Sequence, residues 1–338
     1  MLFASITAFV VAATFVSIAL YLLKDMFIKK GYYGLDVHKP TNPKVAEMGG
    51  LVSSFFVIFV LSALWFYLKA PLKSLDFVFD LTFVYYTLFG LVDDLSPLNG
   101  KIKLFLSLFG GVFVELVAEL FDIKFYSPRP FLPLIGQIHG IYTLYPFLIP
   151  IALAITSNAY NMYDVYNGTL SFASIANYLL IGTLVIFDLD SGYPAFFSFL
   201  AFLCAGVSLG LFIVNRYPSR FFLGDVGSLP LGAAFGMLAI MSHLEIVSAI
   251  AIMPMLMNGF LVFASAKKIF ERHEIKQRPV IVENGLIRAN PSKEAPMSLA
   301  NILTSRKPLT EKQIIIRYHL LSIISIILAI FTFLLTPW

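Results

Sequence analysis

Two adjacent carboxylates, Asp93 and Asp94, lie at the end of one long apolar stretch of the sequence. Lys103 lies just inside the next apolar stretch. If the stretch is a membrane helix, these carboxylates face the negative end of the helix dipole, at a depth where an unpaired charge is costly. The pair therefore requires a cation, unless both side chains simply reach water at the membrane boundary. Because neighbouring helical residues point about 100° apart, we expect one carboxylate to face a metal and the other to serve a different partner.

A second stretch carries four polar residues at every third position: Asn158, Asn161, Asp164 and Asn167. On a helix this spacing lays carboxamides and a carboxylate along one slowly drifting face. Such a face is costly against lipid, so we expect it to line a wet cavity or a binding site. Hydrogen bonding between neighbouring helices is the alternative interpretation.

A third motif places Asp225 between two glycines, in the order Phe221-Phe222-Leu223-Gly224-Asp225-Val226-Gly227. Glycine lets the backbone approach a bulky ligand closely while the carboxylate holds a cation. A tight turn is the alternative, because Gly-Asp is common in turns. The motif lacks the spacing and the lysine of a P-loop.

Two further groups of charged residues are ambiguous by themselves. The first follows the first apolar stretch and comprises Asp36, His38, Lys39, Lys44 and Glu47. The second belongs to a long basic loop and comprises Arg272, His273 and Arg278. A solvated loop looks much the same, so these residues become candidates for substrate binding only because they occur together with the three acidic motifs.

The acidic motifs offer oxygen ligands, since they contain no cysteine and no clustered histidine. Hard oxygen ligands favour Mg²⁺, or Mn²⁺, over Zn²⁺. Mg²⁺ held by a few protein groups close to lysine and arginine is the arrangement that binds diphosphates in phosphoryl transfer. The sequence therefore predicts a magnesium site for a phosphorylated substrate.

The composition predicts an integral membrane protein. Hydrophobic residues make up 59% of the 338 positions and charged residues 13%, with a mean hydropathy of +0.84. Residues 1–23 are apolar with no basic residue before them, which favours a retained first span over a cleaved signal peptide. Further spans are predicted at about 48–68, 76–92, 102–121, 144–160, 170–187, 194–214, 229–242, 245–266 and 314–335. We expect an all-α, polytopic membrane protein with about ten transmembrane helices in one domain over residues 1–338, and no nucleic-acid partner.

Basic residues are distributed unevenly between the predicted loops. If the loops after the odd-numbered spans share one face, that face carries 20 of the 24 lysines and arginines, and the other face carries four. Positive loops stay in the cytoplasm, so we expect both termini outside and a site formed by cytoplasmic loops. The sequence also predicts a small β-ribbon within the outer loop 122–143 and a hairpin around Asn284-Gly285 in the cytoplasmic loop 267–313.

These motifs, in this order and between these helices, resemble those of the polyprenyl-phosphate N-acetylhexosamine-1-phosphate transferases. The likeness covers nearly the whole chain, from Lys39-Pro40 and Gly49-Gly50 to the acidic motifs described above. Each motif is weak alone, and the combination is highly specific. The resemblance implies that a membrane polyprenyl phosphate attacks the sugar-side phosphorus of a UDP-sugar, which gives a lipid-diphosphate sugar and UMP. Related enzymes are often dimers, so the resemblance is compatible with a homodimer.

The resemblance also implies roles for individual residues in the metal and phosphate chemistry. Asp225 and Asn161 match Mg²⁺ ligands, and Asp93 and Asp94 match the acidic catalytic pair. Lys103 matches a contact to the diphosphate or the lipid phosphate.

Other matching positions concern the nucleotide. Phe222 resembles the aromatic residue that stacks on uracil, and Asn167 resembles the residue that reads the edge of the base. Asn158 opens the Asn-Ala-x-Asn part of the motif and is a further candidate for substrate binding. Asp164, a candidate catalytic residue, matches the bacterial pattern, whereas the eukaryotic enzymes have a non-acidic residue there.

The long loop departs from the bacterial peptidoglycan pattern, which has a run of histidines where this chain has only His273, followed by Glu274. Arg272, His273 and Arg278 are closer to the dolichol-type or archaeal-type enzymes, in which this loop contacts the diphosphate and the N-acetyl group. We therefore expect UDP-N-acetylglucosamine as donor, with a phospho-muramoyl-pentapeptide or another N-acetylhexosamine donor as the alternative.

Two questions stay open at the level of sequence. In one mechanism the lipid phosphate attacks directly, and Asp93 or Asp94 orients it or removes its residual proton. In the other mechanism the reaction passes through an aspartyl-phosphate. A different class of protein, an ion-coupled transporter, also uses intramembrane Asp and Asn. Transporters place such residues near the bilayer midplane, whereas every cluster here lies at a predicted helix end on one face.

Overall fold

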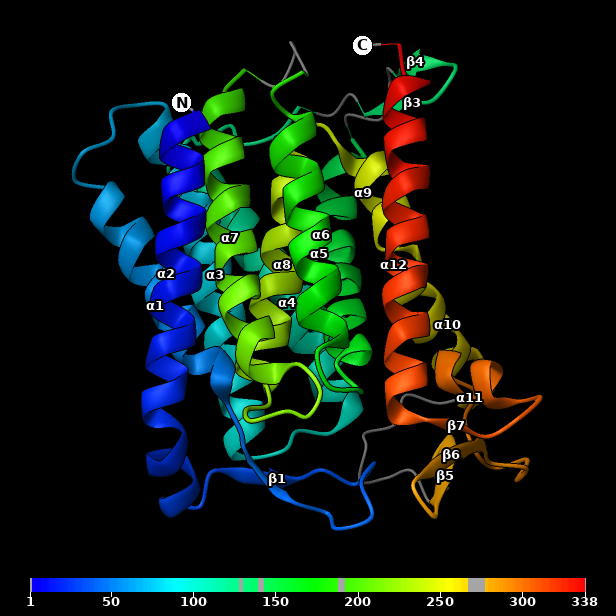
Figure 1. The fold of residues 1–338 in the computed structure, drawn as a ribbon. Helices are drawn as coiled ribbons and strands as arrows, with labels where there is room; N and C mark the ends of the chain where they lie inside the picture. The colour runs from blue at the N-terminus through cyan, green and yellow to red at the C-terminus, as the bar shows by residue number, and fades with distance from the viewer. Residues whose placement is uncertain (1, 128–129, 139–142, 188–191, 267–276, 338) are drawn as a thin grey trace.

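The computed structural model describes residues 2–127, 130–138, 143–187, 192–266 and 277–337. Long helices with roughly parallel axes form one bundle (Figure 1). The helices are α1 (Leu2–Lys29), α2 (Gly49–Leu64), α3 (Leu72–Leu95), α4 (Gly100–Leu120), α5 (Tyr145–Tyr163), α6 (Thr169–Leu184), α7 (Pro194–Asn215), α8 (Asp225–Met241), α9 (Glu245–Ala251), α10 (Met253–Ala266), α11 (Leu299–Thr304) and α12 (Glu311–Leu334).

Apart from the stretch 245–266, each apolar stretch predicted as a span coincides with one helix. Among the described residues, four helices (α1, α3, α7 and α12) are long and apolar enough to cross a membrane. The stretch predicted as one span over 245–266 is instead broken into α9 and α10, which are bent by 69° and count as a fifth candidate when taken together. The chain is therefore a mostly helical, multi-pass membrane protein.

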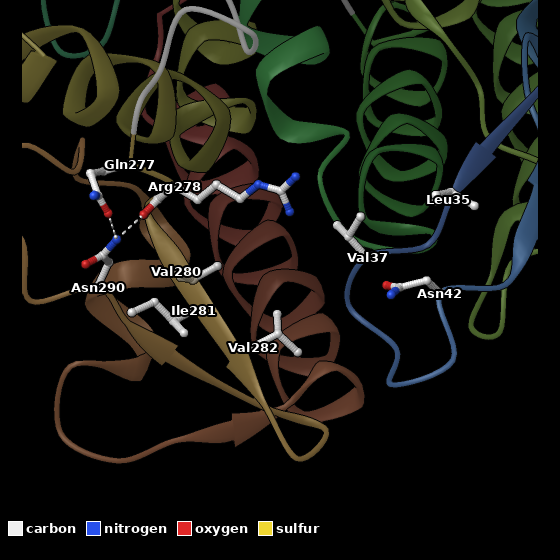
Figure 2. A pocket seen from close by; sticks show the side chains of 9 residues that line it. All are labelled: Leu35, Val37, Asn42, Gln277, Arg278, Val280, Ile281, Val282 and Asn290. Carbon is white, nitrogen blue, oxygen red and sulfur yellow. Dashed lines mark hydrogen bonds between the residues drawn. The ribbon is translucent and has the colours of Figure 1, made fainter.

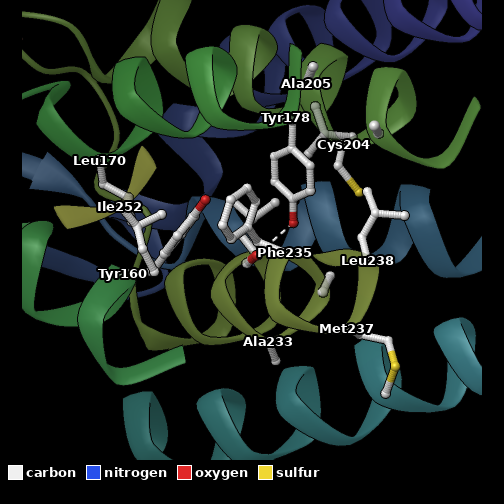
Figure 3. Packing of buried hydrophobic residues seen from close by; sticks show 14 of the residues in the cluster. Tyr160, Leu170, Tyr178, Cys204, Ala205, Ala233, Phe235, Met237, Leu238 and Ile252 are labelled. Carbon is white, nitrogen blue, oxygen red and sulfur yellow. Dashed lines mark hydrogen bonds between the residues drawn. The ribbon is translucent and has the colours of Figure 1, made fainter. Parts of the chain in front are cut away.

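Helix α8 lies at the centre of the bundle and is buried along nearly its whole length. It packs against α3 and α5 most extensively. Phe235 of α8 lies between the rings of Tyr160 and Tyr178, and the Tyr178 hydroxyl donates a hydrogen bond of 2.6 Å to the carbonyl oxygen of Leu231 (Figure 3). A buried helix of this kind fixes the position of both of its ends, because its neighbours contact it on every side.

Short strands lie at both ends of the bundle (Figure 1). At the end where α1 begins and α12 finishes, β3 (Phe131–Leu132) pairs with β4 (Gly136–Gln137), within the predicted ribbon. At the opposite end, β1 (Tyr33–Leu35) pairs with β2 (Lys44–Ala46), and β5 (Val280–Glu283), β6 (Leu286–Ala289) and β7 (Leu309–Thr310) form a three-stranded sheet. Asn284 and Gly285 have φ of 52° and 75°, so the predicted Asn-Gly hairpin is confirmed.

The predicted single polar face over residues 158–167 is wrong. Helix α5 ends at Tyr163, Asp164 is its C-cap, and Gly168 takes a φ of 79° before α6 begins. Asn158 and Asn161 therefore lie on the helix, whereas Asp164 and Asn167 lie in the turn that follows it. The spacing of three matched a helical repeat, but the chain leaves the helix at Asp164, and Gly168 begins the next element.

Close backbone contacts hold α8 against α2 and α3. A Cβ atom added to Gly90 of α3 would lie 2.3 Å from the carbonyl oxygen of Asp225, and one added to Gly50 of α2 would lie 2.1 Å from the Cα of Gly227. Real Cβ atoms do not approach backbone atoms so closely. These glycines therefore allow three helix ends to meet at one place.

We expect Gly90→Ala to force α3 away from the start of α8. Overpacking of this kind costs about 1–3 kcal/mol, so the apparent thermal midpoint of the purified protein in detergent should fall clearly below that of the wild type. Gly259→Ala in α10 is the matched control, because the new Cβ would meet only the Met162 sulfur at 3.6 Å and alanine favours a helix by about 1 kcal/mol. Equal midpoints for the two variants would contradict the close approach of α3 and α8.

Candidate active site

Asp93 and Asp225 come together at the point where α3 ends and α8 begins. The Lys103 ammonium, in the first turn of α4, forms ion pairs with both carboxylates and lies 3.2 Å from Oδ2 of Asp225. The other oxygen of Asp93 accepts a hydrogen bond of 2.8 Å from the backbone N–H of Leu98, in the turn before α4. The structure thus joins three of the predicted site residues, from three helices, in direct contact.

Asp94 has a different task from its neighbour. Its two carboxylate oxygens accept hydrogen bonds of 2.9 Å each from the backbone N–H groups of Asp225 and Val226. It therefore caps the start of α8, where the helix dipole favours a negative charge. Gly224 has a φ of 75°, and a Cβ there would lie 2.5 Å from Oδ2 of Asp94. Asp93 and Asp94 thus have different partners, as predicted, and the metal-facing role of either stays a prediction.

The segment before α8 is held by the start of α2. The backbone N–H groups of Gly49 and Gly50 donate hydrogen bonds of 2.8 Å to the carbonyl oxygens of Phe222 and Leu223. The Phe222 N–H in turn donates to the carbonyl oxygen of Ala46 at 2.7 Å. The Phe222 ring is half-buried and lies beside Gly34, at the same place as the Glu47 carboxylate. An aromatic face on such a rigid segment is suited to stacking against a planar ligand.

Asp164 lies close to this group of carboxylates. Burial, together with the negative charges of Asp94 and Glu47, raises the pKa of Asp164 to about 7. Asp164 follows the last turn of α5 directly, so the end of α5 reaches the same region as the ends of α3 and α8. Its position supports the prediction that Asp164 belongs to the site.

Asn158 links helices α4 and α5, and its role in substrate binding stays a prediction. Its amide nitrogen donates hydrogen bonds of 3.0 Å to the Ser107 hydroxyl of α4 and of 2.8 Å to the Ala154 carbonyl oxygen. The Ser107 hydroxyl donates to the Lys103 carbonyl oxygen at 2.9 Å. The interhelical alternative therefore describes Asn158, and its contacts hold the α4 turn that carries Lys103.

Asn161 lies one turn beyond Asn158 on α5. Helices α4 and α5 are antiparallel, because Ser107 pairs with Asn158 while Gly111 packs against Pro150. Continuing this register by one turn brings Asn161 to the level of Lys103. Its role as a metal ligand stays a prediction.

Lys39 and Asn167 lie in a second group of polar residues. The Lys39 ammonium forms ion pairs with Asp36 and with Glu311, and it lies 3.0 Å from the Glu311 oxygen. The Asn167 amide nitrogen donates to the Asp36 carboxylate at 3.1 Å. Among the described residues, Asp36, His38 and Glu311 are close enough to share a metal ion, but the Lys39 ammonium already lies between the two carboxylates.

The remaining basic candidates lie further out. The Lys44 ammonium lies 4.2 Å from the centre of the Tyr33 ring, on the strand pair β1–β2. Arg278 precedes β5 and lines a pocket of about 480 Å³, in which its side chain extends toward Val37 (Figure 2). None of the carboxylates around Asp225 lines this pocket. Arg272 and His273 lie outside the described residues.

The carboxylates around Lys103 offer oxygen donors of the kind that a divalent cation prefers. Asp93, Asp94 and Asp225 carry three potential negative charges, and the Lys103 ammonium balances only one. The Lys103 ammonium brings the Asp93 and Asp225 carboxylates to one place, and a set of oxygen ligands fits Mg²⁺.

Sequence reasoning missed two residues that support these groups, Ser107 and Glu311. Glu311 is separated from Lys39 by 272 positions, and its local context is that of a helix start, since Thr310 and Gln313 form a capping box around it. Ser107 lies inside an apolar stretch. Ser107 follows Lys103 by four residues, which places both on one face of a helix. This spacing is the signal in the sequence that associates Ser107 with the site.

Comparison with known proteins places the chain in a family. Residues 77–243 match the family model described as glycosyl transferase family 4. A protein of Methanocaldococcus jannaschii, provisionally named a glycosyltransferase, is 30% identical over 92% of this chain and 89% of its own length. The chain therefore belongs to glycosyl transferase family 4, the family of polyprenyl-phosphate sugar-1-phosphate transferases.

Other relatives carry more specific names. A protein of Saccharolobus solfataricus, provisionally named a UDP-N-acetylglucosamine–dolichyl-phosphate N-acetylglucosaminephosphotransferase, is 28% identical over 69% of this chain and 70% of its own length. A Bacillus subtilis protein, provisionally named an undecaprenyl-phosphate N-acetylglucosaminyl 1-phosphate transferase, is 27% identical over 80% of this chain and 73% of its own. Bacterial phospho-N-acetylmuramoyl-pentapeptide-transferases also match. The resemblance found in the sequence is confirmed at the level of the family.

We expect Asp94→Asn to destabilise the fold, because an amide offers one acceptor to the two N–H groups that Asp94 binds. A buried donor left without its partner costs about 1–3 kcal/mol, measurable as a lower free energy of unfolding in mixed detergent micelles without metal. Glu283→Gln makes the same chemical change at an exposed ion pair with Arg288, so its stability should equal that of the wild type. Equal losses in both variants would contradict the capping role of Asp94.

Proposed function

We propose that the protein transfers N-acetylglucosamine 1-phosphate from UDP-N-acetylglucosamine to a membrane polyprenyl phosphate of the dolichyl type, and releases UMP. This would be the first membrane step in the assembly of a glycan. The observation that carries the proposal is the meeting of Asp93, Lys103 and Asp225 at the ends of three helices. An acidic, lysine-containing site that can hold Mg²⁺ is suited to binding and transferring a phosphoryl group.

The proposal includes a topology of ten spans with both termini outside and the site at the cytoplasmic face. The start of α1 and the end of α12 lie at one end of the bundle, and the strands β1, β5 and β6 lie at the other (Figure 1). The carboxylates lie at the end of α3 and the start of α8, which belong to the end rich in lysine and arginine. A site at this boundary is accessible to a water-soluble sugar nucleotide and to a lipid phosphate.

The chemistry is an in-line displacement at the sugar-side phosphorus of the UDP-sugar. An oxygen of the lipid phosphate forms a bond to that phosphorus, the bond from the phosphorus to the bridging oxygen breaks, and its electron pair leaves with UMP. A phosphate monoester loses its second proton at about pH 6, so the attacking phosphate is largely a dianion at neutral pH. Asp93 orients it or accepts its residual proton, since Asp94 uses both oxygens on α8.

Each of the other residues has a place in this proposal. Asp225 and Asn161 hold Mg²⁺, which when bound stabilises the negative charge of the diphosphate. Lys103 contacts the diphosphate or the lipid phosphate, and Asp164 lies beside them. Phe222 stacks on the uracil ring. Glu47 lies beside Phe222, and Lys39, Lys44 and Arg278 are assigned to the outer parts of the substrate site.

The donor sugar is the finer part of the proposal. The relative from Saccharolobus solfataricus and the one from Bacillus subtilis both have names that specify an N-acetylglucosamine phosphate. Among the described residues of the long loop, Arg278 lines the same pocket as Leu35 of β1. A muramoyl-pentapeptide donor is the second candidate, because other relatives have names that specify it.

We expect the purified protein to release UMP from UDP-N-acetylglucosamine when a polyprenyl phosphate and Mg²⁺ are present, and to stop when the metal is chelated. Asp225→Asn and Asp93→Asn should each reduce the rate by about a hundredfold or more, because the first would weaken the hold on Mg²⁺ and the second removes the carboxylate that orients or deprotonates the lipid phosphate. Glu283→Gln is the control, since its exposed ion pair with Arg288 lies on the β5–β6 hairpin.

The assay includes UDP-N-acetylmuramoyl-pentapeptide as a second donor. Faster release of UMP from that donor would replace N-acetylglucosamine in the proposal, and no UMP from either donor would reject the enzyme. Near-normal rates in both aspartate variants, at wild-type stability, would contradict the assignment of the site.

We expect direct attack to leave no covalent intermediate on the protein. Labelled UMP should therefore not exchange into UDP-N-acetylglucosamine in the absence of lipid phosphate, because the sugar phosphate has no acceptor. Exchange at a rate comparable to turnover would instead establish an aspartyl-phosphate, and its loss in Asp93→Asn would locate that phosphate.

A further inference from the structure

Asn167 is held by an acidic residue of the second polar group. Its side-chain nitrogen donates to the Asp36 carboxylate at 3.1 Å. The Lys39 ammonium joins this carboxylate to that of Glu311. Asp36, Asn167 and Glu311 are each at most 4% exposed, so water does not compete for these contacts.

The contact with Asp36 fixes which way the Asn167 amide points. A carboxylate that is paired with an ammonium offers only acceptors, so the amide nitrogen must face it. The amide oxygen then lies on the opposite side of the group and remains an acceptor. Without the Asp36 carboxylate, the nitrogen and the oxygen of Asn167 could exchange places by a rotation about the last side-chain bond.

The polar group is connected to the proposed nucleotide site through a short extended segment. Gly34 packs against the Phe222 ring, and Asp36 lies two residues further along the chain. Two extended residues span about 6–7 Å, a distance comparable to the width of a pyrimidine ring. A base stacked on Phe222 would therefore have its edge near the Asn167 amide.

We propose that Asp36 is a positioning residue that presents the Asn167 oxygen to the N3–H group of uracil and so makes the site selective for uridine over cytidine nucleotides. The inference rests on the proposed function, because it concerns the same nucleotide. Uracil has a hydrogen on N3 and cytosine has a lone pair there. An acceptor held in place pairs with uracil and repels cytosine, whereas an amide free to turn accepts either base.

The experiment measures the binding of UMP and of CMP to the full-length protein in detergent with Mg²⁺, by titration calorimetry. We expect the wild type to bind UMP at least about tenfold more tightly than CMP, the effect of about one hydrogen bond. Asp36→Ala should bring the ratio of the two dissociation constants close to one, mainly through weaker UMP binding. Glu283→Gln should keep the wild-type ratio.

A double substitution separates positioning from simple stability. Asn167→Asp alone places two carboxylates face to face and should weaken UMP binding by about tenfold or more. Adding Asp36→Asn restores one donor and one acceptor between the two positions and keeps an acceptor at position 167, so UMP binding and its advantage over CMP should return. All of these changes preserve side-chain volume, and the apparent thermal midpoint reports whether each variant is folded.

The outcomes distinguish this inference from the proposed function. A wild type that binds UMP and CMP equally, or binds neither, would contradict the proposed uridine site itself. A wild type that prefers UMP supports that site. In that case, an unchanged ratio in Asp36→Ala, or a double variant that binds UMP as weakly as Asn167→Asp, would overturn the role of Asp36 alone.

Discussion

The candidate site depends on the contact between the end of α3 and the start of α8. A carboxylate in the last turn of its own helix is unfavourable, because the helix dipole is negative there. Asp94 avoids this cost by capping α8, whose first N–H groups require acceptors. This cross-helix cap, together with the close approach at Gly90, fixes Asp93 and Asp225 as neighbours. The other contacts of the site are built around that pair.

Charge balance differs between the two polar groups. Around Lys103, one ammonium faces the carboxylates of Asp93 and Asp225, with Asp94 beside them, so the group carries excess negative charge. Such a site would repel a diphosphate unless a cation is bound first, which couples metal binding to substrate binding. Around Lys39, one ammonium faces the two carboxylates of Asp36 and Glu311, and the Asn167 amide donates to Asp36. The second group therefore carries less excess negative charge than the first, and its contacts hold a shape.

Local patterns in the sequence predicted the parts of the structure that local forces determine. The apolar runs predicted helices, and Asn284-Gly285 predicted a hairpin. The angle between neighbouring helical residues predicted that Asp93 and Asp94 have different partners. The errors arose where distant contacts decide. The repeat of polar residues after Asn158 suggested a continuous helix, but the chain turns at Asp164. Glu311 gave no signal of its contact with Lys39, because that contact closes a loop of 272 residues.

Helix N-termini often bind phosphate groups through free backbone N–H groups, yet the two at the centre of this site are already occupied. The carbonyl oxygens of Phe222 and Leu223 accept from the first residues of α2. The Asp94 carboxylate accepts from the first residues of α8. Neither helix start can therefore bind a diphosphate without first giving up a buried hydrogen bond. Under the proposed function, recognition of phosphate therefore relies on positive charges, namely Lys103 and the cation that the surrounding carboxylates would hold.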